Sequence, residues 1–210
     1  NSAIFHSDAG QAPLYLPTVV DSLGVDLLSL GGNKLYGPHG IGALYVGKNT
    51  SIAPIVFGGK QERGIRAGTE SVVLAAGFTA AFKEVGHIRM YESKRVKAMR
   101  DELMWALAEK IPGLLVNGDI SHTLPHMLNV SIPNINSEYI ALALDHAGIA
   151  ISTKSACREG EESRSHVVEA LGGEKWRAEN TFRFSLGRGI SSQDFVRTLN
   201  ALSTFLESST

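Results

Sequence analysis

The chain has 210 residues, of which 43% are hydrophobic and 20% are charged, as in an ordinary globular protein with a sizeable core. The formal net charge of -1 excludes a broad positive field that would attract nucleic acid or an anionic membrane surface. No apolar run approaches the roughly 20 residues of a membrane span. The single cysteine excludes an internal disulfide framework, so we expect a reducing, cytoplasmic setting. From the charge and the lack of a long apolar run we expect no nucleic-acid or membrane partner.

The first half of the chain alternates short apolar segments with glycine-rich turns. We expect strands at residues 3–6, 25–29 and 42–46, with a helical stretch between the first two. A long helix is expected over residues 71–110, interrupted near Gly86. Its later part places apolar residues on one face at helical spacing: Val96, Met99, Leu103 and Leu107.

The second half is predicted to alternate further strands and helices. The expected elements are strands at 114–117, 127–132, 149–153 and 181–186, and helices at 137–147, near 163–171 and from Ser191 onward. This alternation predicts an α/β fold. We place a domain boundary within the long helix, which gives units of residues 1–88 and 89–210.

Lys34 stands in a context that is unusual for a surface lysine. It follows an apolar strand and two glycines, and we expect its base to be buried. A desolvated lysine favours the free amine, which forms Schiff bases with carbonyl compounds. Asp8, at the end of the first strand, offers a carboxylate for the pyridine nitrogen of a cofactor such as pyridoxal 5'-phosphate (PLP), and Gln11 is close enough in sequence to reach the same ligand.

Cys157 lies in a polar stretch just after an expected strand. A lone cysteine is most often a small buried hydrophobe. Lys154 and Arg158, however, would favour the thiolate, which is the nucleophilic form. Local sequence leaves the two interpretations evenly balanced.

Two further segments have the composition of anion-binding sites. Residues 58–70 concentrate glycines, Arg63 and Arg66 before a helix, which suits an anion but also an ordinary basic loop. Arg183 alternates with Phe182 and Phe184 in a strand, so it points away from the phenylalanines and suits either a carboxylate ligand or a structural ion pair. The seven histidines show no metal-ligand spacing, and we predict no metal site.

Taken together, these segments resemble the cysteine desulfurases of the NifS/IscS type, which are class V aminotransferase-family enzymes with the PLP-dependent fold type I. The motifs that carry the resemblance are HSDAGQ (6–11), GGNKLYGPHGIGALYV (31–46), GGKQERGIRAGTE (58–70), LPHMLNVS (124–131), SACREG (155–160) and RFSLGR (183–188). The resemblance spans nearly the whole chain. It implies part of a large PLP-binding domain at 1–88 and a small C-terminal domain, with the cysteine loop, at 89–210.

The resemblance also implies a role for each of these residues. Lys34 would hold PLP as a Schiff base and then act as the base that moves protons, while Asp8 and Gln11 would bond the ring nitrogen and the ring hydroxyl. Arg183 would bind the carboxylate of L-cysteine, and Cys157 would take the sulfur as a persulfide and release alanine. Thr69 would contact the phosphate held by the partner subunit of a homodimer. The sulfur would then pass to an iron–sulfur scaffold or another acceptor protein.

The sequence departs from the family pattern in two ways. Gly31 and Asn33 stand where the family usually has a serine and a histidine near the cofactor phosphate, and each lost hydrogen bond weakens PLP retention by about 1 kcal/mol. The Schiff-base lysine, usually midway along about 400 residues, is at position 34. We therefore interpret the chain as the C-terminal half of the enzyme, either cut from a longer chain or completed by a separate N-terminal half.

Two other interpretations remain. The chain could be a non-catalytic subunit that has lost the cofactor, which Gly31 and Asn33 favour and the retained Lys34, Asp8 and Cys157 oppose. It could also act on a different substrate, as selenocysteine lyases do.

Overall fold

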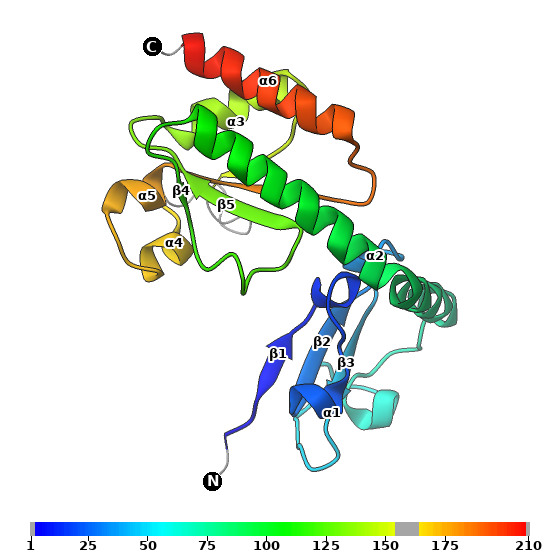
Figure 1. The fold of residues 1–210 in the computed structure, drawn as a ribbon. Helices are drawn as coiled ribbons and strands as arrows, with labels where there is room; N and C mark the ends of the chain where they lie inside the picture. Colours follow the sequence, from blue (N-terminus) through cyan, green and yellow to red (C-terminus); the bar gives the residue numbers. More distant parts are fainter. Residues whose placement is uncertain (1–2, 154–163, 209–210) are drawn as a thin grey trace. The chain divides into compact units, whose positions relative to one another are not determined.

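The protein, seen in a computed structural model that describes residues 3–153 and 164–208, divides into two compact units (Figure 1). The first comprises residues 1–93 and the second residues 94–210. Helix α2 (Val72–Lys110) contributes to both. The expected boundary between residues 88 and 89 also falls inside this helix.

The first unit is built on a three-stranded sheet in the order β1-β2-β3. Strand β1 (His6–Asp8) runs parallel to β2 (Leu27–Gly31), and β3 (Gly42–Val46) pairs antiparallel with β2. The short α1 (Val20–Leu23) lies between β1 and β2 in the sequence. Three short 3-10 helices complete the unit: Ala12–Leu14, Asn33–Leu35 and Glu62–Gly64.

The first strand begins later than predicted. The apolar residues that suggested a strand at 3–6 are largely exposed, Ile4 by 61% and Phe5 by 54%. The regular pairing with β2 instead joins His6 to Leu27 and Asp8 to Ser29. Backbone pairing with β2 therefore determines where the strand lies, and the hydrophobicity of the segment does not.

The first unit buries little apolar surface of its own sheet. The core around β1 and β2 consists of Ala9, Val25 and Leu28. Large apolar side chains elsewhere in the unit are exposed, including Ile55 by 90% and Phe57 by 82%. Exposed apolar surface of this kind typically marks an interaction face.

Helix α2 is continuous through Gly86, so the predicted interruption there is wrong. A glycine in a helix interior costs about 1 kcal/mol relative to alanine, which a helix of 39 residues held by packing tolerates. The predicted apolar face is confirmed, because Val96, Leu103 and Leu107 are buried. Among the described residues, no helix is both long and apolar enough to cross a membrane.

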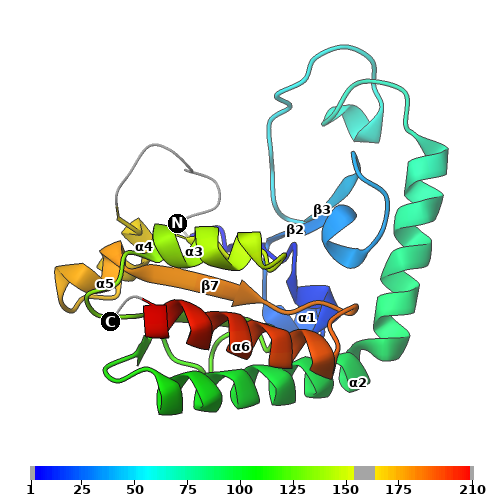
Figure 2. The ribbon, with the colours of Figure 1, turned by 90° about the horizontal axis from the view of Figure 1, so that it is seen from above.

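The second unit is an antiparallel sheet of four strands in the order β4-β5-β7-β6. Its strands are β4 (Leu115–Val116), β5 (Met127–Ser131), β6 (Ser152–Thr153) and β7 (Thr181–Ser185). Its further helices are α3 (Ser137–His146), α4 (His166–Ala170), α5 (Lys175–Glu179) and α6 (Ser192–Ser208). Helices α3 and α6 run along β7 (Figure 2).

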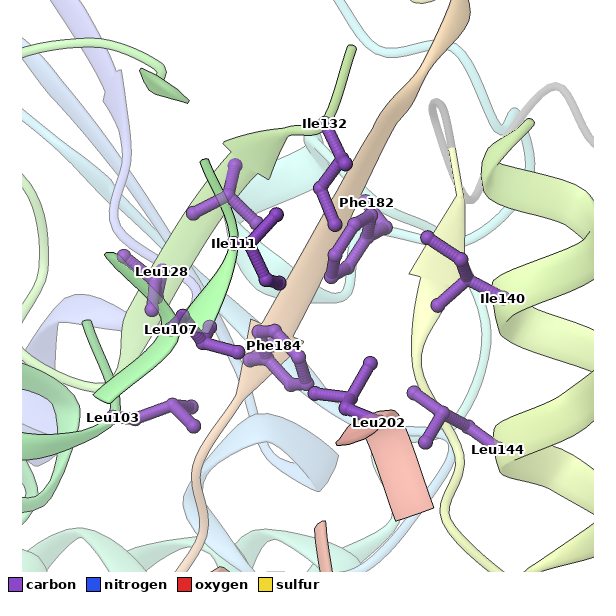
Figure 3. Close-up of a cluster of buried hydrophobic side chains, with 11 residues drawn as sticks. Leu103, Leu107, Ile111, Leu128, Ile132, Ile140, Leu144, Phe182, Phe184 and Leu202 are labelled. Carbon is purple, nitrogen blue, oxygen red and sulfur yellow. The ribbon is translucent and has the colours of Figure 1, made fainter. Parts of the chain in front are cut away.

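One face of this sheet carries the core of the second unit (Figure 3). Leu128 and Phe182 from the strands meet Leu107 of α2, Ile140 of α3 and Leu202 of α6, all at most 2% exposed. The alternation of β-strands sends residues 127, 129 and 131 of β5 and residues 181, 183 and 185 of β7 to the opposite face. Five of these six residues are polar, Met127 being the exception, and they include Arg183.

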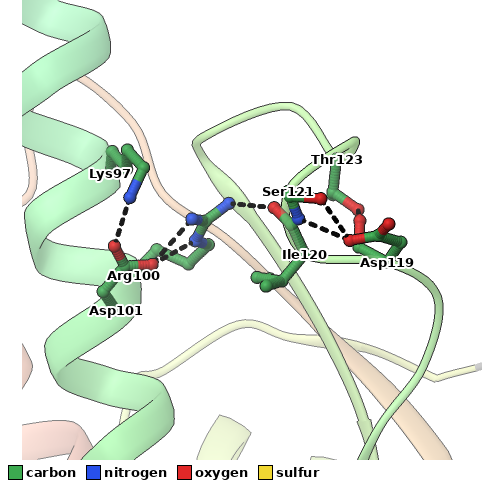
Figure 4. Close-up of polar contacts among 7 residues, drawn as sticks. All are labelled: Lys97, Arg100, Asp101, Asp119, Ile120, Ser121 and Thr123. Atoms are coloured by element: carbon green, nitrogen blue, oxygen red, sulfur yellow. Dashed lines mark hydrogen bonds and ion pairs between the residues drawn. The ribbon is translucent and has the colours of Figure 1, made fainter.

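A charged cluster joins α2 to the loop after β4 (Figure 4). Arg100, 2% exposed, donates from Nη2 to Asp101 at 2.6 Å and from Nη1 to the Ile120 carbonyl at 3.5 Å. Burial acts to raise the pKa of Asp101, but hydrogen bonds from Lys97 and Arg100 outweigh it and the pKa is lowered. In the same loop, the Ser121 hydroxyl and the His122 ring lower the pKa of Asp119 to about 2.

Candidate functional site

Asp8 and Lys34 lie at the carboxyl ends of two parallel strands, at the same edge of the first sheet. Asp8 is the last residue of β1, and Lys34 lies in the 3-10 turn Asn33–Leu35 just after β2. Because β1 and β2 are parallel neighbours, their carboxyl ends share this edge. In open α/β sheets, ligands bind outside the carboxyl ends of the strands. The topology thus brings an amine and a carboxylate to a typical ligand-binding edge.

The Asp8 carboxylate is oriented by the backbone that follows it. Its Oδ1 accepts a hydrogen bond from the N–H of Gly10 at 2.9 Å, and the N–H of Ala9 continues the pairing with β2 through the Ser29 carbonyl. Gln11 precedes the 3-10 helix Ala12–Leu14 and is exposed. Asp8 is exposed as well, so both side chains are accessible to a ligand.

The turn that carries Lys34 requires a glycine at its start. The N–H of Gly32 bonds the Ile41 carbonyl and the N–H of Gly37 bonds the Gly32 carbonyl, which closes the turn. A Cβ on Gly32 would lie 2.8 Å from the Pro38 carbonyl oxygen, so only glycine fits. The sequence GGNKLYGP therefore fixes the backbone conformation of the turn that carries Lys34.

The expected burial of Lys34 is wrong for the described residues. Its side chain is exposed, as is that of Asn33, and within the turn Leu35 is the residue that packs inward, at 1% exposed. An apolar strand before a lysine fixes its backbone but does not supply the surface that covers the amine. Desolvation of Lys34 would have to come from other protein surface.

Gly31 is not demanded by the backbone. A Cβ built there would meet Asn33 Oδ1 at 3.3 Å and Lys34 Cγ at 3.8 Å, both atoms of exposed side chains that can move. The position could therefore hold the serine that the family usually has. Its absence removes a hydroxyl donor beside Lys34.

The glycine-rich segment before α2 places Thr69 at the surface. Arg66 forms an isolated bridge with Val56, and the N–H of Gly68 bonds Gln61 Oε1 at 3.2 Å. Gly68 has a φ of +108°, which disfavours any side chain there. Thr69 is exposed at the approach to α2. The predicted contact of Thr69 with a phosphate stays a prediction.

Arg183 occupies the centre of the polar sheet face in the second unit. Its cross-strand neighbours are Asn129 on β5 and Ser152 on β6. Its Nη2 donates to the Ser152 hydroxyl at 3.4 Å, while its buried Nε has no hydrogen-bond partner among the described residues. A buried donor without a partner is rare and costly. This guanidinium is a strong candidate for binding a carboxylate, and the predicted separation of Arg183 from the phenylalanines is confirmed.

A hydrogen-bond network that the sequence did not predict surrounds Asn129. The Asn117 amide donates to Asn129 Oδ1 and to the Ser131 hydroxyl, both at 2.7 Å, and the Thr181 hydroxyl donates to Asn129 Oδ1 at 2.8 Å. Arg177 of α5 donates to Asn117 Oδ1 at 2.7 Å. The network joins β5, β7, the residue that follows β4 and helix α5, and it holds Asn129 in place beside Arg183. The polar residues Asn129 and Ser131 in the motif LNVS were the sequence feature from which this network could have been predicted.

The sequence indicated no role for His126. In the structure, the charge of Arg183 acts on its imidazole. It is 4% exposed, and the Leu186 N–H bonds its carbonyl at 2.8 Å. Burial first, and the Arg183 charge second, lower the pKa of His126 from 6.5 to about 4. The imidazole is therefore neutral near pH 7.

This shift predicts a pH-dependent stability. The unfolded chain protonates His126 near pH 6.5 and the folded chain only near pH 4, so stability is lost as the pH falls through this window. The loss approaches about 3 kcal/mol. We expect urea unfolding between pH 4.5 and 7.5 to show a weaker pH dependence for His126→Gln than for wild type. The exposed His146→Gln should keep the wild-type dependence, and equal slopes for all three proteins would contradict the assignment.

Cys157 lies outside the described residues, so its predicted role is untested. Among residues 3–153 and 164–208, no group of three or more His, Asp or Glu side chains is placed to hold a metal ion.

Comparison with known proteins gives a consistent family. The aminotransferase class-V family model matches residues 1–197. The cysteine desulfurase of Gluconacetobacter diazotrophicus is 40% identical over 95% of this chain, and the cysteine desulfurase IscS of Dictyoglomus turgidum is 39% identical over 97%. These alignments cover 50% and 52% of the two relatives, so the chain spans about half their length.

Solved structures agree with the sequence relatives. A NifS-like protein superposes with a TM-score of 0.87 and 28% identity over 98% of this chain and 53% of its own. A NifS-like protein from Rickettsia africae gives 0.85 and 27% over 98% and 54%. The predicted resemblance and the predicted α/β fold of the PLP-dependent type I class are thereby confirmed. The chain belongs to the aminotransferase class-V family, among relatives named cysteine desulfurases.

Proposed function

We propose that this protein acts as a cysteine desulfurase, which takes sulfur from L-cysteine and leaves L-alanine. The observation that carries the proposal is that Asp8 and Lys34 lie at the same edge of two parallel strands, in a chain related to cysteine desulfurases. Arg183 adds a buried donor that a substrate carboxylate would satisfy.

The residues at the strand edge fit the cofactor PLP by their chemistry. Lys34 offers the primary amine of a Schiff base, and the Asp8 carboxylate, fixed by Gly10, suits a protonated pyridine nitrogen. Gln11 would bond the ring hydroxyl, and Asn33 would lie on the phosphate side. Thr69 would contact the phosphate of the partner subunit in a homodimer. When bound, PLP supplies an electron sink for bond cleavage at the substrate carbons.

The chain's own residues would then divide the remaining work. Arg183 would hold the substrate carboxylate through charge-assisted hydrogen bonds, which fixes the orientation of L-cysteine. The Lys34 amine would accept and return the proton at the substrate Cα. The neutral state of His126 keeps a second positive charge away from Arg183 near pH 7.

Cys157 would be the sulfur acceptor. Its thiolate would attack the substrate sulfur, forming an S–S bond while the bond between substrate Cβ and sulfur breaks and its electron pair stays with carbon. Proton uptake by that carbon fragment gives alanine, and the sulfur remains on Cys157 as a persulfide. A scaffold protein for iron–sulfur clusters, or another cytoplasmic acceptor, would receive it.

A second candidate function is favoured by the exposure of the strand-edge residues. Asp8, Gln11, Asn33 and Lys34 are all exposed, although a Schiff-base site needs cover from water. The chain would then be a subunit completed by a separate N-terminal half, inactive alone. Turnover that appears only after an N-terminal half from a relative is added would favour this candidate. A selenocysteine lyase-like activity would appear as preferred turnover of L-selenocysteine, unaffected by Cys157→Ser.

The direct test is production of alanine and sulfide from L-cysteine with PLP and a thiol reductant. Loss of a charged, bidentate contact costs about 1.5–3 kcal/mol, so we expect Arg183→Lys to raise KM for L-cysteine by about 10- to 100-fold. The exposed Arg197→Lys serves as a matched control and should leave KM unchanged. Equal KM values for wild type and Arg183→Lys would remove the carboxylate role of Arg183.

A further inference from the structure

The guanidinium of Arg183 has a specific neighbour that neither the family motifs nor the mechanism above uses. We propose that Ser152 is a positioning residue for Arg183, whose Nη2 donates to the Ser152 hydroxyl at 3.4 Å. Arg183 is half-buried, so its guanidinium cannot rely on bulk water to hold it in place. A fixed orientation matters because a carboxylate must meet two N–H groups at once.

Other polar neighbours of Arg183 are committed elsewhere or repel it. Asn129, across from Arg183 on β5, already has its Oδ1 bonded by Asn117 and Thr181. His126 contributes an unfavourable charge interaction when protonated. Within the described part of the chain, Ser152 is the acceptor that Arg183 binds.

The position of Ser152 gives this contact a functional meaning. Strand β6 consists of Ser152 and Thr153 and pairs with β7, Ser152 opposite Arg183 and Thr153 opposite Phe182. It is the last described element before residues 154–163, which include Cys157. One hydrogen bond thus joins the proposed carboxylate site to the strand from which the cysteine-bearing segment departs.

Substitutions at the two residues of β6 can distinguish the positioning of Arg183 from a general contribution of this strand to the fold. Ser152 shares the polar face with Arg183, whereas Thr153 shares the core side with Phe182. Replacing Thr153 by valine removes a hydroxyl from the same strand without touching the Arg183 contact. Ser152→Thr keeps the hydroxyl and suits a strand, so it is the conservative variant that should restore the wild-type behaviour.

The inference rests on the proposed function only where it concerns the substrate, and the test has two parts. In the 210-residue chain labelled with 15N, the Nε–H signal of Arg183 is assigned by its loss in Arg183→Lys. Without ligand, we expect hydrogen exchange at this Nε–H to be about threefold faster in Ser152→Ala. The reason is that Nη2 loses its acceptor, so the whole guanidinium is held less firmly. Ser152→Thr and Thr153→Val should match wild type. Titration with L-alanine as carboxylate probe should then give a Kd about fivefold weaker in Ser152→Ala.

Each outcome is decisive. Unchanged exchange in Ser152→Ala overturns the proposal, and so does equally fast exchange in Thr153→Val, which would indicate general loosening of β6. Altered exchange confined to Ser152→Ala supports the positioning role even if L-alanine fails to move the Arg183 signal of the wild type. That last result would count against the carboxylate role of Arg183, and therefore against the proposed function instead.

Discussion

Replacing Lys34 with alanine is expected to lower alanine production from L-cysteine by about a thousandfold or more. The amine has two tasks in the proposed function, binding the cofactor covalently and moving the proton at the substrate Cα. General acid–base catalysis alone contributes about 100- to 10,000-fold, and no neighbouring lysine stands in the turn of residues 31–38 to replace it. Because Lys34 is exposed and its turn is held by backbone hydrogen bonds, the substitution should leave the fold intact.

The matched control is Lys48→Ala, which removes an exposed lysine from the same unit. Steady-state assays of both variants, with circular dichroism to confirm folding, separate a chemical role from a structural one. Equal loss in both variants, or full activity in Lys34→Ala, would contradict the account.

Replacing Cys157 with serine is expected to abolish transfer of sulfur to the protein and to reduce alanine formation by at least about a hundredfold. A serine hydroxyl is far less nucleophilic than a thiolate and cannot hold sulfur as a persulfide. Cys157 is the sole cysteine of the chain, so the readout is unambiguous. Mass spectrometry after a brief reaction with L-cysteine should show one added sulfur atom on the peptide containing Cys157.

The control for Cys157→Ser is the binding of PLP, which should be equal in variant and wild type because no cofactor role is assigned to the thiol. Added sulfur elsewhere in the chain, or undiminished alanine formation in the variant, would exclude Cys157 as the acceptor.

The strands were predictable where local chemistry determined them. Residues 42–46 form β3 as predicted, because glycines bound an apolar run that pairs with β2 along its whole length. In β7, the alternation of Phe182, Arg183 and Phe184 predicted both the strand and its two faces. Helix α5 was missed because its five residues show no apolar periodicity and no side chain caps its start.

The candidate site was predictable residue by residue but not in its environment. Asp8 and Lys34 could be identified from the strands that precede them, yet the exposure of Lys34 depends on surface that no local pattern encodes. The neighbours of Arg183 depend on antiparallel pairing between segments far apart in the sequence, which brings Asn129 and Ser152 to its two sides. Local sequence carries no signal for such cross-strand contacts.

The most direct test of the central claim is to locate the cofactor bond. The chain is incubated with PLP, reduced with borohydride, digested, and its peptides are mapped by mass spectrometry. The account predicts a pyridoxyl group on Lys34, absent from Lys48 and Lys60 and lost in Lys34→Ala. Labelling of other lysines while Lys34 stays unmodified, even with an N-terminal half supplied, would contradict it.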